Sequence, residues 1–151
     1  MAATDPFPSR LLGIIRSCGL FQDLTPKELD DLLIYLRMIR TQKGYEIIRQ
    51  GDSWESFYVI ISGRVSVWIK KGQKTGKVAE IGKDGFFGEM ALLTKKVRNA
   101  TIVSEEVSEL LVLNKREFES ILMAHPKRAE KILSAYAARK AQLKKKKLLT
   151  L

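Results

Sequence analysis

The sequence predicts an α+β fold in which an antiparallel β-barrel or roll lies between helical segments. The middle of the chain, residues 38–81, consists of short runs rich in Ile, Val, Tyr, Phe and Trp that are punctuated by glycines, a pattern typical of strands joined by tight turns. Apolar residues recur at helical spacing before this region and again after Pro126, which indicates helices on both sides of the strands. With 151 residues, the chain suits one domain that can fold unaided.

The N-terminal segment is expected to be a loose lead-in over residues 1–9, followed by helices within residues 10–37. A first helix is expected over residues 10–18. The run Thr-Pro-Lys-Glu at 25–28 predicts the start of a second helix, because it combines an N-cap hydroxyl, proline at the first helical position and Glu three residues after the cap. The buried face of this helix is predicted to consist of four leucines at helical spacing: Leu29, Leu32, Leu33 and Leu36.

The strand region is expected to span residues 38–113. Its clearest strands are four runs rich in apolar and β-branched residues, at 57–61, 64–69, 100–103 and 109–113. Ser62-Gly63 suggests a tight turn between the first two of these runs. The stretch 86–103 reads as a loop, one short helix and a second loop that closes on a strand, so the sheet is split around it.

Residues 114–143 are predicted to form two more helices. Asn114 and Glu117 predict a cap at the start of the first helix, as Thr25 and Glu28 do for the earlier one. This first helix would direct three apolar side chains inward: Phe118, Ile121 and Leu122. Pro126 ends or kinks this helix, and a second helix follows with apolar residues at helical spacing: Ala129, Ile132, Leu133 and Tyr136. Residues 144–151 are expected to be a basic tail, because four adjacent lysines repel one another there.

The net charge of +10 belongs mainly to the C-terminal end. Residues 125–151 hold nine Lys and Arg against one Glu, which gives +8, whereas residues 1–124 hold eighteen against sixteen acidic residues, which gives +2. Since a lysine near an anionic lipid surface contributes about 1 kcal/mol, a nucleic-acid or membrane-surface role of the tail is one alternative. The tail is short and lacks interleaved aromatic residues, so a solvated helix end is favoured, and neither nucleic acid nor a membrane is the expected partner.

The chain offers little for catalysis or for a metal. Cys18 is the only cysteine and His125 the only histidine, which excludes an internal disulfide and a multi-histidine metal site. A histidine-based triad is not expected either, because the one histidine sits just before Pro126. No apolar run approaches the length of a membrane span, and no signal peptide opens the chain. We therefore expect a cytoplasmic protein that binds no metal and catalyses no reaction.

The stretch 86–103 predicts a binding site for an anion. Gly88 removes side-chain bulk where the backbone must approach something closely, and the residues from Gly88 to Leu93 suit about two turns of helix, whose first amides lack intrahelical partners. Arg98 presents a planar fork of donors that matches two phosphate oxygens. Glu89 is a carboxylate beside this anion site, where it would suit neutral hydroxyls on the same ligand. A sugar phosphate meets both demands.

This stretch resembles the phosphate-binding cassette of the cyclic-nucleotide-binding domains found in the catabolite activator protein, protein kinase A regulatory subunits and nucleotide-gated channels. That cassette has the form Phe-Gly-Glu, a hydrophobic residue, Ala-Leu, a short loop, and then Pro-Arg-Ala-Ala-Thr-Val. The chain matches it without a break, with Phe87-Gly88-Glu89-Met90-Ala91-Leu92-Leu93, a loop of Thr94-Lys95-Lys96, and Val97-Arg98-Asn99-Ala100-Thr101-Ile102. The resemblance implies a jelly-roll-like β-roll with N-terminal helices, a short cassette helix and C-terminal helices that form a hinge and a lid.

The resemblance also implies which residues contact the ligand. Arg98 would pair with the phosphate and Glu89 would accept the ribose 2′-hydroxyl. The other cassette positions expected at the sugar and phosphate are Gly88, Met90, Ala91 and Asn99. The base is expected to lie against Val67 and Val78, with Ile81 nearby, and three residues of the last helix are candidates for a lid over the base: Ile132, Leu133 and Tyr136. Each of these apolar residues could instead only pack the fold.

The chain departs from the family pattern at three places in the cassette. Val97 replaces the proline before the arginine, and Lys95 and Lys96 replace the usual small loop residues. Asn99 stands where binders of cyclic AMP often have Ala and many binders of cyclic GMP have Thr, whose hydroxyl can meet the guanine amino group. Asn could imitate Thr or merely offer its amide, so cyclic AMP is the first expectation and cyclic GMP the second.

The leading interpretation is a non-catalytic cyclic-nucleotide sensor. Binding would let the hinge and lid helices repack against the roll, and this movement would signal to a protein effector that the sequence does not identify. The alternatives are the basic-tail binder and a degenerate domain used only for protein contacts, although the presence of both Glu89 and Arg98 argues against the second.

Overall fold

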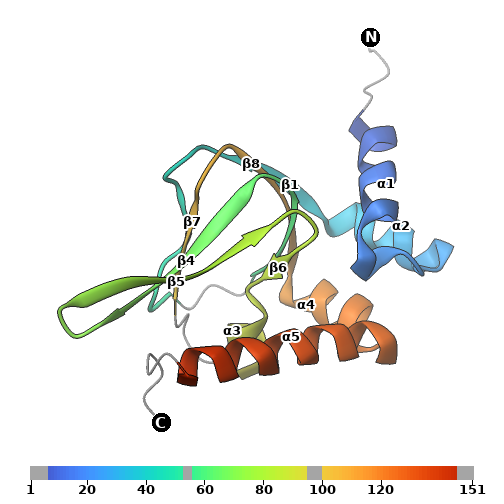
Figure 1. Cartoon of the computed structure of the whole chain (residues 1–151). Coiled ribbons are helices and arrows are strands. Elements are labelled where there is room, and N and C mark those ends of the chain that lie inside the picture. The colour runs from blue at the N-terminus through green and yellow to red at the C-terminus, as the bar shows by residue number, and fades with distance from the viewer. Residues whose placement is uncertain (1–6, 53–55, 95–99, 146–151) are drawn as a thin grey trace.

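The computed structural model describes residues 7–52, 56–94 and 100–145, and its strands form two antiparallel four-stranded sheets that face one another (Figure 1). The first sheet has the order β1-β8-β3-β6, with bounds Arg37–Thr41, Ser108–Asn114, Ser56–Ser62 and Phe86–Phe87. The second has the order β2-β7-β4-β5, with bounds Glu46–Ile48, Thr101–Ser104, Arg64–Lys71 and Lys74–Gly82. The predicted α+β roll is confirmed.

The helices lie at one end of the roll and along its open side (Figure 1). They are α1 Phe7–Ser17, η1 Gly19–Phe21, α2 Pro26–Tyr35, α3 Glu89–Thr94, α4 Lys115–Glu117, the π-helical η2 Phe118–Met123, and α5 Pro126–Lys145. Residues 7–9 belong to α1 rather than to a loose lead-in, since Pro8 falls in the first helical turn, where its missing N–H is not needed. Within the described ranges, no helix is both long and apolar enough to cross a membrane.

The start of α2 confirms its predicted cap. The amide of Glu28 donates to Thr25 Oγ1 at 3.1 Å, and the amide of Thr25 donates to Glu28 Oε1 at 3.0 Å, so two amides that lack helical partners are satisfied reciprocally. Leu32 on the predicted apolar face is fully buried. The cap predicted at Asn114 is present too, since its Oδ1 accepts from the amide of Glu117 at 3.1 Å.

The first sheet is buried on both faces, and this explains the continuous apolar runs of its central strands. In β8, Leu111 and Leu113 pack against the helices, whereas Leu110 and Val112 face the interior of the roll. The same alternation runs through β3, where the Phe57 ring lies 5.0 Å from that of Phe118 in η2. Two core clusters result, one between helices and sheet and one between the sheets.

A buried arginine ties the first turn of α5 to the N-terminal helices. Arg128 is only 2 % exposed, and it donates to Asp23 Oδ1 at 3.0 Å, to Glu28 Oε2 at 2.7 Å and to the Ile121 carbonyl at 2.8 Å. The hydrogen bond from Arg128 is the main reason that the pKa of Glu28 falls from 4.5 to about 2, and it lowers the pKa of Asp23 as well. The base of α5 is therefore fixed by charge and by hydrogen bonds.

The turn between β3 and β4 requires glycine for two reasons. Gly63 has φ +93°, and a Cβ placed on it would lie 2.7 Å from the Ser108 Cα and closer still to the Ser108 Oγ. The predicted tight turn at Ser62-Gly63 is confirmed, and the close approach of β8 adds a constraint that turn chemistry alone does not contain.

We expect Gly63→Ala to lower the free energy of unfolding by about 3 kcal/mol, because left-handed strain adds to overpacking against Ser108. Gly44→Ala is the matched control, since Gly44 has φ +89° and a Cβ added there would meet no atom within 4 Å, and about 1 kcal/mol is expected there. Urea unfolding measures both. Equal losses in the two variants would show that the contact with Ser108 is immaterial.

Candidate functional site

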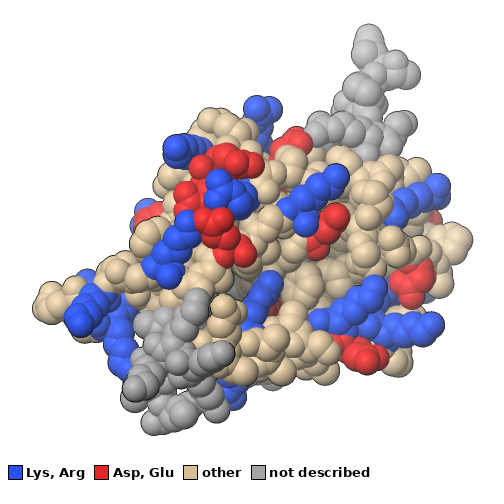
Figure 2. Space-filling model, in the orientation of Figure 1, with Lys and Arg blue, Asp and Glu red and all other residues tan. Residues whose placement is uncertain are grey.

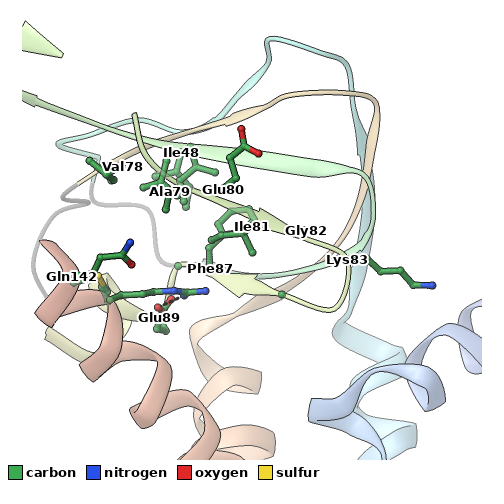
Figure 3. A pocket seen from close by; sticks show the side chains of 17 residues that line it. Ile48, Val78, Ala79, Glu80, Ile81, Gly82, Lys83, Phe87, Glu89 and Gln142 are labelled. Atoms are coloured by element: carbon green, nitrogen blue, oxygen red, sulfur yellow. Dashed lines mark hydrogen bonds and ion pairs between the residues drawn. The ribbon is translucent and has the colours of Figure 1, made fainter. Parts of the chain in front are cut away.

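A cavity of about 390 Å³ lies between the second sheet, α3 and α5 (Figure 3). Its walls are largely apolar and come from strands of both sheets and from Ala100 just before β7: Ile48, Val67, Val78, Ala79, Ile81, Phe87, Ala100 and Ile102. Gly88, Glu89 and Met90 line it from the start of α3, and Arg139 and Gln142 line it from α5. The cavity thus offers one apolar side and one side with a carboxylate, a guanidinium and an amide.

A β-bulge in β5 builds the apolar wall. Val67 pairs with Ala79 and Trp68 with Lys77, so Val78 is the extra residue on β5 and both it and Ala79 line the cavity. Without the bulge, Val78 and Ile81 would point to opposite faces of the strand. Glu80 bonds with Arg64 and Lys77, and Figure 3 shows its side chain directed away from the cavity.

Glu89 is the buried charge of the cavity. Its side chain is 1 % exposed, and it follows Gly88, whose φ of +98° is a conformation that favours glycine. One Arg139 nitrogen donates to Glu89 Oε1, and a second donates to the Phe86 carbonyl. The Arg139 guanidinium also lies 5.1 Å from the centroid of the Phe86 ring, within the range of a cation–π contact. A cation from α5 therefore neutralises the carboxylate at the start of α3.

Six of the predicted ligand residues line this one cavity. They are Val67, Val78, Ile81, Gly88, Glu89 and Met90. Ala91 lies in α3, and its side chain is not among those described, so the role expected of it stays a prediction. Arg98 and Asn99, together with Val97, Lys95 and Lys96, lie outside the described residues, so the roles expected of them stay predictions.

The three lid candidates lie elsewhere on α5. Ile132 is fully buried in the core between the helices and the first sheet, Leu133 is 48 % exposed, and the ring of Tyr136 has Lys140 Nζ 5.8 Å from its centroid. None of them is among the described residues that line the cavity. Arg139 and Gln142, which line the cavity from α5, were missed because they are polar. Arg139 lies seven residues after the buried Ile132 and therefore on the same face of the helix, whereas Gln142 is an exposed residue.

The cavity can hold a ligand with one flat, weakly polar part and one hydroxyl-bearing part. The apolar walls suit a ring, and a buried carboxylate suits hydroxyl donors. Among the described residues, no group of three or more His, Cys, Asp or Glu side chains is placed to hold a metal ion.

Comparison with known proteins places this geometry in a family. The family model described as the cyclic nucleotide-binding domain matches residues 38–125. The chain is 32 % identical over 129 residues to the cAMP-dependent protein kinase type II regulatory subunit of Drosophila melanogaster, and it covers 33 % of that protein while 85 % of its own length is matched. It is 31 % identical over 126 residues to the cyclic AMP receptor protein of Thermus thermophilus, of which it covers 58 %, with 83 % of the chain matched.

Solved structures agree with this assignment. The crystal structure of the Thermus thermophilus catabolite activator protein superposes with a TM-score of 0.68 at 32 % identity, over 85 % of this chain and 61 % of that one. The regulatory subunit of a cAMP-independent protein kinase A from Trypanosoma brucei has the same fold, with a TM-score of 0.74 at 24 % identity over 86 % of this chain and 47 % of that one. The chain spans between a third and three fifths of the length of the two curated relatives named above. It belongs to the cyclic nucleotide-binding domain family.

Proposed function

We propose that the domain is a non-catalytic sensor that binds cyclic AMP, with cyclic GMP as the second ligand. The observation that carries this proposal is the burial of Glu89, at 1 % exposure, beside the apolar wall of a cavity of about 390 Å³. Arg139 offsets the cost of burying this carboxylate, and a ribose hydroxyl is the further donor that the cassette sequence implies. The names of the relatives, a cAMP-dependent kinase regulatory subunit and a cyclic AMP receptor protein, support the choice of ligand.

In this proposal each part of the nucleotide meets a different wall. The base lies against Val67, Val78 and Ile81, which line the cavity from β4 and β5. The ribose 2′-hydroxyl donates to Glu89, the carboxylate that Arg139 contacts at Oε1. The phosphate lies at the start of α3, where backbone amides of the cassette and the side chain of Arg98 would donate to it.

Calorimetric titration tests the proposal, with cyclic AMP, cyclic GMP, 5′-AMP and guanosine as ligands. We expect cyclic AMP to bind more tightly than 5′-AMP, because the linear nucleotide carries more charge and a different phosphate geometry. Guanosine belongs in the panel because a Trypanosoma cruzi regulatory subunit with the same fold, at 22 % identity and a TM-score of 0.67, is described as bound to it. Failure of both cyclic nucleotides to bind would contradict the proposal and favour a degenerate domain used for protein contacts.

We expect cyclic AMP to bind at least as tightly as cyclic GMP. Asn99 lacks the threonine hydroxyl that can meet the guanine amino group, and one such side-chain contact is worth about 1 kcal/mol, or about fivefold in affinity. Titration of Asn99→Thr measures this contact, since the substitution should raise the affinity for cyclic GMP and leave that for cyclic AMP nearly unchanged. A clear preference of the unmodified protein for cyclic GMP would show that Asn99 or Gln142 reads guanine.

The signal is proposed to leave through α5. Because Arg139 and Gln142 line the cavity, a ligand there changes the contacts of α5, and a helix position that binds the ligand better becomes more populated. The altered position of α5 would then be recognised by a protein effector. A coupling free energy of about 1 to 3 kcal/mol is ordinary for such a switch.

Hydrogen exchange over residues 126–142 tests this route. We expect cyclic AMP to change amide protection in the second half of α5 and Arg139→Ala to reduce that change, because the substitution removes the bond between α5 and Glu89. Lys127→Ala, at an exposed position in the first turn of α5, is the matched control and should respond as the unmodified protein does. Substitution is preferable to truncation, since Arg128 and Ile132 belong to the buried core. Identical protection of α5 with and without ligand would assign the signal to another surface.

A further inference from the structure

The tip of the β4–β5 hairpin, residues 70–75, projects beyond the roll as a two-stranded ribbon (Figure 1). β7 pairs with β4 only from Val65 to Trp68, so no third strand accompanies β4 past that point within the described parts of the chain. Lys70 pairs with Thr75 and Lys71 with Lys74 across the ribbon. All six residues of the tip are exposed. The strands β4 and β5, which contribute to the wall of the cavity, thus continue beyond the roll as an exposed two-stranded tip.

The tip is basic on both of its faces. Lys70 lies on the same strand face as Ser66 and Trp68, with which it lines a surface groove, and Lys71 points to the opposite face because neighbours in a strand alternate. Lys74, the cross-strand partner of Lys71, shares that second face. The segment 69–79 contains four lysines and no acidic residue. Figure 2 shows Lys and Arg atoms gathered at this projecting end.

This arrangement costs stability within the fold. Lysines directly opposite one another on a ribbon repel, and the ion pairs of the described residues include none with Lys70 or Lys74. Lys77, closer to the roll, is instead paired with Glu80 and Glu105. Near the roll the hairpin thus has acidic partners, whereas its tip contributes three lysines and no acidic residue, which is the distribution expected where an anionic surface approaches end-on.

The ribbon is held in place at its base. The Gln50 side chain donates to the Lys70 carbonyl at 3.0 Å and accepts from the Lys70 amide at 2.8 Å, so one amide group replaces the missing neighbouring strand. The amide of Gln50 in turn donates to Thr101 Oγ1 at 3.0 Å. The lysines beyond Lys70 therefore extend from a braced position.

We propose that the lysine tip is a contact site for an anionic lipid bilayer. Charge on both faces suits end-on contact with a plane, whereas a ribbon that lies in a nucleic-acid groove uses one face. The tip also carries no aromatic residue on which unpaired bases could stack. Phospholipid headgroups of a negative leaflet attract lysines near their surface without any inserted side chain. The lysine tip is a second basic feature of the chain, separate from the basic tail. The proposed bilayer contact does not depend on the proposed cyclic nucleotide ligand.

Co-sedimentation with vesicles tests the proposal. The probes are vesicles of phosphatidylcholine with roughly a third phosphatidylserine and vesicles of phosphatidylcholine alone. The full chain is expected to bind the anionic vesicles and to be released by high salt. Lys70→Gln, Lys71→Gln and Lys74→Gln combined should weaken binding about tenfold to a hundredfold, since three lysines near the surface are lost.

A second triple variant controls for net charge. Lys27, Lys127 and Lys131 lie in α2 and α5, away from the hairpin, and their replacement by Gln changes the charge by the same amount. Retained binding in this variant, with loss in the tip variant and unchanged cyclic AMP affinity in both, supports the proposal. Equal losses in the two variants, full binding by the tip variant or no binding by the full chain would overturn it. Tip-dependent binding to duplex DNA or to polyglutamate in place of vesicles would overturn it as well and identify the partner.

Discussion

Replacing Arg98 by alanine is expected to weaken cyclic AMP binding at least about thirtyfold, which corresponds to a loss of roughly 2 to 5 kcal/mol if the ion pair with the phosphate is buried. The cassette supplies no second arginine, so the cyclic phosphate would keep backbone donors but lose its charged partner. Arg98→Lys should recover only part of the affinity, because an ammonium cannot donate to two phosphate oxygens in one plane. Calorimetric titration of the folded variants measures all three affinities.

Arg40→Ala is the matched control for this experiment. Arg40 is exposed on β1, in the sheet that does not hold the Val67 and Val78 wall, so its removal takes away one positive charge without touching the cavity. Affinity in this variant should stay within about twofold of the unmodified protein, as expected for a distant surface charge. Undiminished affinity in folded Arg98→Ala would remove the phosphate role assigned to the arginine.

Arg128→Met is expected to lower the free energy of unfolding by about 3 kcal/mol. The substitution keeps most of the side-chain volume but removes every donor to Asp23, Glu28 and the Ile121 carbonyl. Loss of a buried partner costs about 3 to 5 kcal/mol where the remaining charge stays buried. Here Asp23 is 50 % and Glu28 25 % exposed, so water offsets part of that cost. Lys127→Met, at an exposed position in the first turn of the same helix, should change stability by less than about 0.5 kcal/mol, and urea unfolding compares the two.

The difference between Arg128→Met and the unmodified protein should shrink in acid. A carboxyl whose folded pKa is depressed stabilises the folded state fully above its unfolded pKa, and this stabilisation is lost as the pH falls through the folded value. Glu28, with its pKa lowered from 4.5 to about 2, loses its contribution between those two values, and Asp23 acts in the same direction. Urea midpoints near neutral pH and near pH 3 test this, and a difference that is constant or larger in acid would contradict the assigned ion pairs.

Local sequence was sufficient for the elements whose causes are local. The helix α2 follows from a cap that joins Thr25 and Glu28, three residues apart, and from leucines within two turns. The turn at Gly63 follows from two residues and their neighbours. The strands β3 and β4 follow from runs of β-branched and aromatic residues. In each case the interactions that decide the structure lie within a few positions along the chain.

Other features depended on contacts between distant parts of the chain. The bulge that brings Val78 and Ala79 to the cavity depends on the register between two strands. Alternation within β5 alone would place Val78 on the face of the strand opposite to Ile81. Arg139 reaches Glu89 fifty positions away, and Arg128 reaches Asp23 across more than a hundred. A polar residue on a mostly polar helix has no distinctive pattern, since its role comes from what packs against it.

The division between what sequence determined and what tertiary structure decided follows from the range of the forces involved. Capping, turn conformation and helical or strand periodicity act within one or two turns, so the residues at 25–36 and 56–69 specify them directly. The identity of the carboxylate in the cavity, Glu89, was also available from sequence, because the cassette that contains it is one contiguous segment. Only the packing of α5 on the roll decided which of its residues line the cavity: Arg139 and Gln142 do so, whereas Ile132, Leu133 and Tyr136 are not among the described lining residues. The burial of Arg128 and Ile132 sets the rotation of the helix.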